Sequence, residues 1–224
     1  MNILIVLIPV SITLGAAGLA ATVAGDLSGG GSVVYGLAKG QVSGWQLSAG
    51  GTPGAEVATR GAAAAYARPG AVALELADLG GGAQVLLLAD RMEQGIQSYR
   101  VEPNNGALSV ADSLGAADGL GLAEPTALES FTAFGSSWVV VAAAGSGSLS
   151  LMSVAGNGAL SLSDQLNDTA TTRFGGLSAL EVVTLADGTV LVLAAGSDDG
   201  ISLLRMVPSG QVLHLTSLAH DSGL

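Results

Sequence analysis

The sequence predicts an all-β repeat protein, and three observations lead to this fold class. Glycine is abundant, with 34 residues in a chain of 224, so turns are frequent and long helices are disfavoured. A short segment recurs along the chain at an almost constant spacing. Each copy of that segment has the same neighbours, namely an apolar run before it and a turn with an alternating run after it.

The recurring segment is six residues long and occurs four times. Its copies begin at Val42, Ile96, Leu149 and Ile201, which are spaced by 54, 53 and 52 residues. The two best-matched copies are 149–154 and 201–206. Spacing as regular as this indicates tandem structural units of about 52 residues.

Apolar runs precede the copies, at 33–35, 85–88, 138–141 and 190–193. Short runs of this kind, rich in β-branched residues and bounded by glycine, predict strands that are buried on both faces. A glycine-containing turn, such as 144–148 or 196–200, joins each run to the recurring segment and predicts a β-hairpin.

After the recurring segment come a second turn and an alternating strand. The turns are 103–106, 156–158 and 208–210, and the strands that follow them are 107–110, 159–162 and 211–215. A further strand precedes each apolar run, at 74–76, 128–130 and 180–182. Each unit is therefore expected to hold four antiparallel strands in meander order, with the second strand the most buried.

This plan is typical of a β-propeller blade. A small β-sandwich is the alternative, but a sandwich does not require near-identical units at a fixed period. We expect the divisions to be 1–17, 18–70, 71–124, 125–175 and 176–224, the last four of these being blades. Residues 222–224 resemble 175–177, which lead into an innermost strand. We therefore expect an incomplete ring, from a chain that is the N-terminal piece of a longer protein.

The N-terminal region allows two interpretations. No charged residue occurs in 3–25, as in a membrane anchor or a signal peptide. However, no Lys or Arg precedes this stretch, and Pro9 and many β-branched residues favour extended structure. The repeat register places 2–8 on 160–166, an outer strand. Residues 1–17 are thus predicted to be a strand that closes the propeller, with an anchor or signal as the alternative.

Composition excludes some partners. The net charge is −11 and Lys39 is the only lysine, so the basic surface that nucleic acid or an anionic membrane requires is missing. The absence of cysteine excludes disulfides and thiolate metal sites. An acidic, lysine-poor composition suits an extracellular or saline setting, and we expect a secreted protein, or one anchored in a membrane through 3–25.

Two motifs carry a resemblance to a known family. They are VVVAAAGSGSLS at 139–150 and VLAAGSDDGISL at 192–203. The units resemble the propeller-like repeats in secreted bacterial proteins of the RTX, or haemolysin-type calcium-binding, family, and the likeness covers about 18–224. It implies export without a cleaved signal peptide. The calcium-binding nonapeptides of that family are absent from this chain, so the resemblance assigns no residue here to calcium.

Three glutamates recur on the predicted innermost strands, and they are Glu75, Glu129 and Glu181. Carboxylates around a central channel could hold a cation or raise one another's pKa. The simpler interpretation is that each glutamate points into a solvated channel or caps a neighbouring backbone group.

Other candidates are weaker. Asp198 and Asp199 lie in a hairpin turn and could bind a cation such as calcium, but the other units have 146–147 and 93–94 there, which favours an ordinary Asx turn. The only histidines are His214 and His220, at the last outer strand, where a solvated side chain is the usual case.

No catalytic or phosphate-binding motif is present in the sequence. We therefore expect a non-catalytic binding or adhesion module, without a cofactor unless calcium binds, whose ligand is a protein or a carbohydrate. The alternative is a lactonase-like hydrolase with a metal ion in the channel, for which Glu75, Glu129 and Glu181 are the candidate ligands. Further partners would be propeller blades, from the same chain or from another copy.

Overall fold

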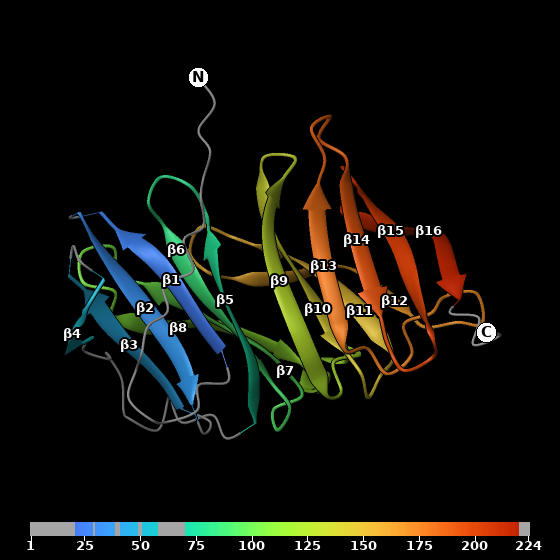
Figure 1. The fold of residues 1–224 in the computed structure, drawn as a ribbon, viewed down its shortest axis with the longest axis horizontal. Helices are drawn as coiled ribbons and strands as arrows, with labels where there is room; N and C mark the ends of the chain where they lie inside the picture. Colours follow the sequence, from blue (N-terminus) through green and yellow to red (C-terminus); the bar gives the residue numbers. More distant parts are fainter. Residues whose placement is uncertain (1–20, 29, 39–40, 49–50, 58–69, 220–224) are drawn as a thin grey trace.

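A computed structural model describes residues 21–219 apart from 29, 39–40, 49–50 and 58–69. The strands form four four-stranded antiparallel sheets, and each sheet follows the chain in meander order (Figure 1). Among the described residues the only helical segment is a short 3-10 turn, Ala116–Asp118. The predicted all-β class and the four-stranded units are confirmed.

Each sheet is called a blade from here on. Blade 1 holds β1 (Ala21–Leu27), β2 (Gly31–Ala38), β3 (Gln41–Leu47) and β4 (Pro53–Glu56). Blade 2 holds β5 (Ala71–Asp78), β6 (Gln84–Asp90), β7 (Gly95–Val101) and β8 (Leu108–Gly115). Blade 3 holds β9 (Pro125–Ala133), β10 (Ser136–Ala143), β11 (Ser148–Val154) and β12 (Leu160–Asn167). Blade 4 holds β13 (Ala179–Thr184), β14 (Val190–Ala195), β15 (Gly200–Val207) and β16 (Gln211–Ala219).

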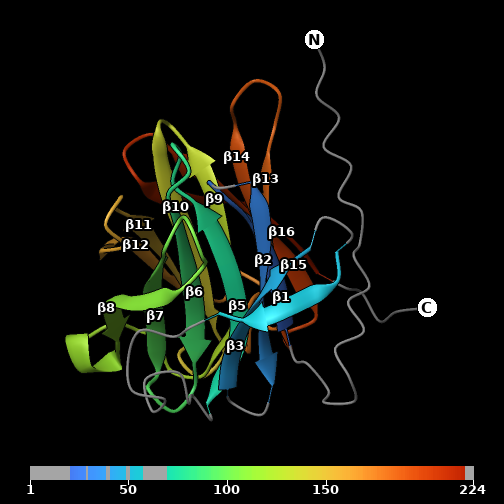
Figure 2. The same ribbon diagram turned by 90° about the vertical axis from the view of Figure 1, so that its left-hand side faces the viewer.

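The blades stand side by side in chain order, from blue to red in Figure 1 and one behind another in Figure 2. Their first strands are neighbours, because β1 contacts β5, β5 contacts β9 and β9 contacts β13. No comparable contact joins β1 to β13 within the described part of the chain. The blades therefore form an arc that is not closed.

A separate hydrophobic core fills the space between each pair of neighbouring blades. Successive side chains of the second strand point to opposite faces of the blade, so one strand contributes to two cores. On β6, Leu86 and Leu88 pack into the core shared with blade 1, whereas Val85 and Leu87 pack into the core shared with blade 3. The prediction that the second strand is buried on both faces is confirmed for β6.

The same prediction is wrong for one face of blade 4. On β14, Val190 and Val192 are buried against blade 3, but Leu191 and Leu193 on the opposite face are only half-buried. The physical reason is that no described blade lies on that side of blade 4. The sequence of the run carries no sign of this difference, because both faces of it are equally apolar.

The outer strand of blades 2, 3 and 4 is irregular at the same place. Its pairing with the third strand shifts by one residue, between Ser98 and Tyr99 in blade 2, and at the matching points of blades 3 and 4. Such a bulge bends the strand and redirects its side chains. The bulge therefore turns Asp112 of blade 2, and Asp164 of blade 3, toward the following blade, where their carboxylates accept hydrogen bonds.

Some predictions lie outside the described residues. These are the closing strand or anchor in residues 1–17, the end of the chain at 222–224, and His220. Among the residues that are described, no helix has both the length and the apolar character needed to span a membrane.

Candidate functional site

The three recurring glutamates occupy matching positions on adjacent first strands. Glu75 lies on β5, Glu129 on β9 and Glu181 on β13, and each is paired with the corresponding residue of its second strand. The first strands of blades 2, 3 and 4 are neighbours, so the glutamates form a row along the inner side of the arc.

Two of these carboxylates form hydrogen bonds with the next blade. The Ser130 hydroxyl donates to Glu75 Oε1 at 3.2 Å. The backbone N–H of Val182 donates to Glu129 Oε2 at 3.0 Å. Ser130 and Val182 each directly follow the glutamate of their own blade, so the two hydrogen bonds lie at matching places, with a side-chain hydroxyl as the donor in one and a backbone N–H in the other. Glu75 and Glu129 therefore join consecutive blades.

The row of glutamates has unusual electrostatics. Burial, and then the negative charge of Glu181, raise the pKa of Glu129 from 4.5 to about 7, against the lowering effect of the Val182 N–H. Burial also raises the pKa of Glu75, while the Ser130 hydroxyl lowers it. Glu129 is consequently partly protonated near neutral pH.

The row does not gather into a metal centre in the described residues, because no three His, Asp or Glu side chains there are close enough to hold one ion. On the structure alone, Glu75 and Glu129 are interblade contacts, and Glu181 is an exposed carboxylate on the same row. Their role as metal ligands stays a prediction that metal analysis would test.

The Asp198–Asp199 turn has a conformational reason for its sequence. Asp199 has a positive φ of 53°, as do Gly147 at 57° and Gln94 at 50° in the matching turns of blades 3 and 2. Asp tolerates this left-handed conformation better than most residues. The left-handed backbone thus gives a reason for an aspartate at 199, while an Asx turn stays a prediction.

Asp198 is less fully explained by the turn. Its Oδ1 is buried and has no hydrogen-bond partner among the described residues. A second carboxylate, Asp168, lies close by, since a Cβ built on Gly175 would be 3.1 Å from Asp168 Oδ2 and 3.6 Å from Asp198 Oδ2. Sequence reasoning missed Asp168, which belongs to the connection after β12. Calcium binding at Asp198 stays a prediction.

His214 is half-buried on β16, and its Nε2 lies 2.8 Å from the Ser217 hydroxyl. The sequence analysis expected a solvated side chain, and the structure shows a half-buried one with a local polar contact.

Sequence reasoning also missed a second repeated contact between blades. The Leu160 N–H donates to Asp112 Oδ2 at 2.8 Å, and the Val212 N–H donates to Asp164 Oδ2 at 2.7 Å. Both donors and acceptors are separated by 52 residues. This spacing is the sequence signal that could have revealed the contact, because two aspartates on outer strands recur with the period of the repeat.

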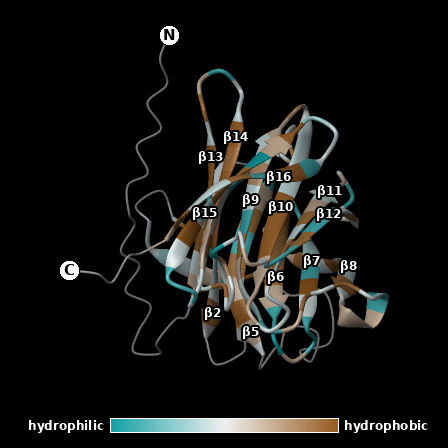
Figure 3. Cartoon of the chain, turned by 90° about the vertical axis from the view of Figure 1, so that its right-hand side faces the viewer, coloured by the Kyte–Doolittle hydropathy of each residue, from teal (hydrophilic) through white to brown (hydrophobic). Residues whose placement is uncertain are grey.

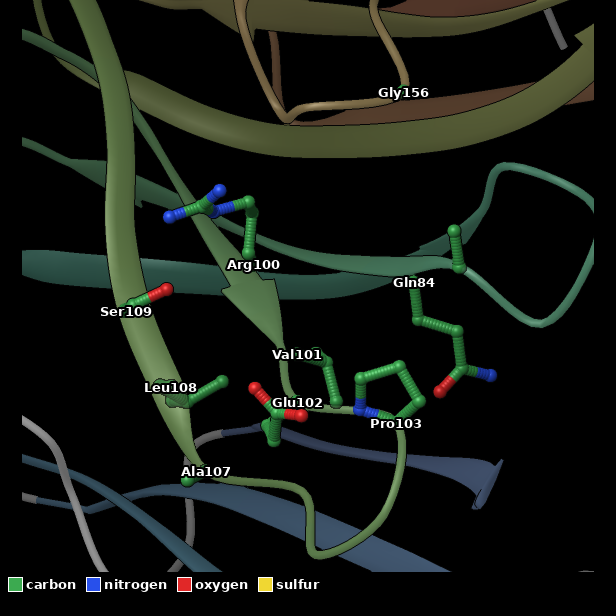
Figure 4. A pocket seen from close by; sticks show the side chains of 10 residues that line it. Gln84, Arg100, Val101, Glu102, Pro103, Ala107, Leu108, Ser109 and Gly156 are labelled. Carbon is green, nitrogen blue, oxygen red and sulfur yellow. The ribbon is translucent and has the colours of Figure 1, made fainter. Parts of the chain in front are cut away.

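A pocket of about 390 Å³ opens beside the outer end of blade 2 (Figure 4). It is lined by the start of β6, the end of β7, the β7–β8 turn and the start of β8, and one residue, Gly156, comes from the β11–β12 turn of blade 3. The pocket therefore lies between two blades rather than inside the central channel.

The lining combines an apolar floor with polar side chains. Val101, Ala107 and Leu108 are buried beneath it. Four polar side chains surround this floor, and they are Gln84, Arg100, Glu102 and Ser109. Figure 4 shows Arg100 and Ser109 on neighbouring strands, with Gly156 in the turn across from them.

Two of the polar groups are available to a ligand. Arg100 and Glu102 are exposed, and neither side chain has a hydrogen-bond or ion-pair partner within the described part of the chain. Blade 3 has Ser153 and Ala155 at the positions that correspond to this pair. The charged pair is thus specific to blade 2, and this difference from the repeat is what the sequence could have shown.

Comparison with known proteins yields no match to any family model and no match to any curated protein. Solved structures do match. A functionally unknown protein from Desulfotomaculum acetoxidans superposes with a TM-score of 0.64 at 12% identity, covering 92% of this chain and 57% of that one. Aleuria aurantia lectin, described as a six-bladed β-propeller with a novel fucose recognition mode, has a TM-score of 0.58 at 14% identity, covering 94% and 66%.

An exo-β-1,3-galactanase from Phanerochaete chrysosporium, solved with galactose, has a TM-score of 0.55 at 10% identity, covering 90% of this chain and 50% of that one. The chain spans between 50% and 66% of the length of these neighbours. The likeness concerns the fold. It supports a β-propeller, present here as an open arc of four blades.

Proposed function

We propose that the chain is a non-catalytic carbohydrate-binding β-propeller module, and that the pocket between blades 2 and 3 holds the sugar. The observation that carries the proposal is the pocket lining, in which unpartnered Arg100 and Glu102 stand over an apolar floor. The lectin among the structural neighbours gives this ligand class its second support, since its description names fucose recognition.

The chemistry of the lining suits a neutral sugar. A monosaccharide presents hydroxyl groups along its edges and C–H groups on its faces. The Arg100 guanidinium donates hydrogen bonds, the Glu102 carboxylate accepts them, and the Ser109 hydroxyl does both. Hydrogen bonds to charged groups are the stronger class, so these side chains can provide most of the affinity for the sugar.

Direct binding measurements test the proposal. A glycan array would identify the sugar, and titration calorimetry would then compare the wild type with Arg100→Ala. We expect the variant to lose about tenfold to hundredfold in affinity, because a hydrogen bond to a charged group contributes about 1.5–3 kcal/mol.

The repeat supplies a matched control. Arg205 on β15 occupies the position that Arg100 occupies on β7, and it is also exposed. Arg205→Ala should bind the sugar as the wild type does. Absence of binding to any glycan, or equal losses in the two variants, would refute the pocket assignment.

The alternative function, that of a hydrolase, has a separate test. A lactonase-like hydrolase would retain a metal ion after purification and cleave lactones, whereas the binding module would do neither. Metal analysis together with a lactone hydrolysis assay of Glu129→Gln distinguishes the two functions, because Glu129 belongs to the row of inner glutamates and not to the pocket.

We also propose that the protein is secreted, in keeping with its acidic, cysteine-free composition and its resemblance to the repeats of RTX proteins. Fractionation of the native source checks this, since the protein should be recovered from the medium. Recovery with the cell membranes would instead favour an anchor in 3–25.

A further inference from the structure

The turn between β7 and β8 forms one side of the pocket, and it departs from the repeat. It supplies three of the lining residues, and they are Glu102, Pro103 and Ala107. A hydrogen bond from the Glu102 N–H to the Ala107 carbonyl closes the turn around 103–106. The corresponding hydrogen bond of blade 3 closes its turn around 156–158. The turn beside the pocket is therefore one residue longer than its counterpart.

Blade 1 holds this longer turn by its backbone carbonyl groups. The Ser28 N–H donates to the Pro103 carbonyl at 2.9 Å. The side-chain amide of Gln46 donates to the Asn105 carbonyl at 3.3 Å. A third hydrogen bond comes from Tyr35. The matching turns of blades 3 and 4 each accept one such hydrogen bond from the described residues of the preceding blade.

The contact made by Tyr35 is the buried one of the three. Tyr35 lies on β2 and is 0% exposed, and its hydroxyl donates to the carbonyl of Gly106, which is also buried. In Figure 4 the blue strands of blade 1 pass below the turn. Because water does not reach this carbonyl freely, loss of the hydroxyl would leave a buried acceptor without that donor. The hydroxyl therefore favours one position of the turn.

Tyr35 is itself a departure from the repeat. The other blades have aliphatic residues at its position, and they are Leu87, Val140 and Leu193. Figure 3 shows the hydrophobic segments of β10 and β14. The ring of Tyr35 fits because its partner on β3 is Gly44, where a Cβ would lie 2.8 Å from the ring. Among the four blades, a tyrosine with a glycine opposite thus occurs in the one that contacts the turn of the pocket.

We propose that blade 1 is part of the sugar-binding site although none of its described residues lines the pocket, and that Tyr35 is the positioning residue. The inference rests on the proposed function, since it concerns the same pocket. A ligand pays for ordering a loose segment on binding, so a segment held in place beforehand gives higher affinity. Blade 1 supplies this order to the turn that carries Glu102 and Pro103.

Tyr35→Phe tests the inference, because it keeps the buried ring and removes the hydroxyl. We expect the glycan that binds best on the array to bind the variant about threefold to tenfold more weakly in titration calorimetry. Hydrogen exchange of 102–107, measured by mass spectrometry without sugar, should become faster. Gln46→Ala, at an exposed position, should change both quantities in the same direction and by less.

Ser163→Ala is the matched control. It removes the donor to the Gly210 carbonyl, at 2.7 Å, which is the corresponding contact between blades 3 and 4 and lies outside the pocket. This variant should exchange faster in its own turn and bind the glycan as the wild type does. An equal loss of affinity in Ser163→Ala and Tyr35→Phe would show a general loosening of the fold and would overturn the inference.

Failure of the inference is distinguishable from failure of the proposed function. If Arg100→Ala weakens binding and Tyr35→Phe does not, the pocket binds the sugar and the positioning role is wrong. If the wild type binds no glycan, the proposed function is wrong, and the exchange rates of 102–107 still decide whether Tyr35 holds the turn.

Discussion

Replacing Glu129 by glutamine should change how the stability of the fold depends on pH. Glu129 is half-buried between blades 3 and 4, and its Oε2 accepts a hydrogen bond from the Val182 N–H. The amide oxygen of glutamine can accept the same hydrogen bond. Glu129→Gln therefore removes the titrating charge and keeps the interblade contact.

The sign of the effect follows from the raised pKa. The unfolded chain titrates near 4.5 at this site and the folded protein near 7, so the folded protein binds more protons in the window between these values. The free energy of unfolding of the wild type consequently falls as the pH rises through the window, and it levels off above it. Acidification to about pH 4.5 restores the full contribution.

The magnitude is set by the size of the shift and by solvent. A rise in pKa from 4.5 to about 7 corresponds to about 3 kcal/mol if it is taken at full value. Water reaches the carboxyl group and screens its neighbours, so about 1 kcal/mol is the expected effect. Glu129→Gln should be more stable than the wild type by that amount at about pH 8, and should equal it at about pH 4.

Urea unfolding followed by circular dichroism at a series of pH values measures this difference. Glu102→Gln is the matched control, because it removes one negative charge from an exposed position of the same acidic protein. Its difference from the wild type measures the effect of removing one negative charge outside the row of inner glutamates. A Glu129→Gln curve parallel to the wild type would refute the electrostatic account of the inner glutamates.

Three further substitutions test the packing between blades, each by the free energy of urea unfolding. Asp112→Ala removes the acceptor for the Leu160 N–H and should cost about 1–3 kcal/mol. Gly158→Ala should cost clearly more than Gly188→Ala, because φ is +86° and +83° at the two positions, but only at Gly158 would the new Cβ lie 2.7 Å from another side chain. Leu87→Ala, at a fully buried position between blades 2 and 3, should cost about 3 kcal/mol.

Most of the fold could be predicted from the sequence because one physical pattern repeats. The second strand of a blade that lies between two neighbours must bury both faces, so it appears as a continuous apolar run such as 85–88. Turns between strands require positive φ at fixed points, so glycines such as Gly106, Gly158 and Gly210 recur with the period. The apolar runs, the glycine-containing turns and the recurring six-residue segment share one period, and together they predicted four strands per unit.

The candidate sites were less accessible to sequence reasoning. Recurrence singled out Glu75, Glu129 and Glu181, but a repeated residue marks a contact that every blade makes with the next, and this is the use the structure shows for the first two. The pocket, in contrast, is not lined by a residue that recurs in every blade. Glu102 departs from the repeat, whereas Arg100 recurs as Arg205 in blade 4. Both pocket residues meet Gly156 of the following blade only in the folded arc, so their spacing along the chain gave no sign of a shared site.

In a repeat protein, contacts between blades and contacts with a ligand place different demands on the sequence. Each blade contacts only its neighbours, so a residue that serves stability must recur with the blades, as Asp112 and Asp164 do. A residue that recognises a ligand is free of that requirement and can occur once. By this criterion Glu102, which is matched by Ala155 in blade 3 and by Val207 in blade 4, is a stronger candidate for recognition than the inner glutamates.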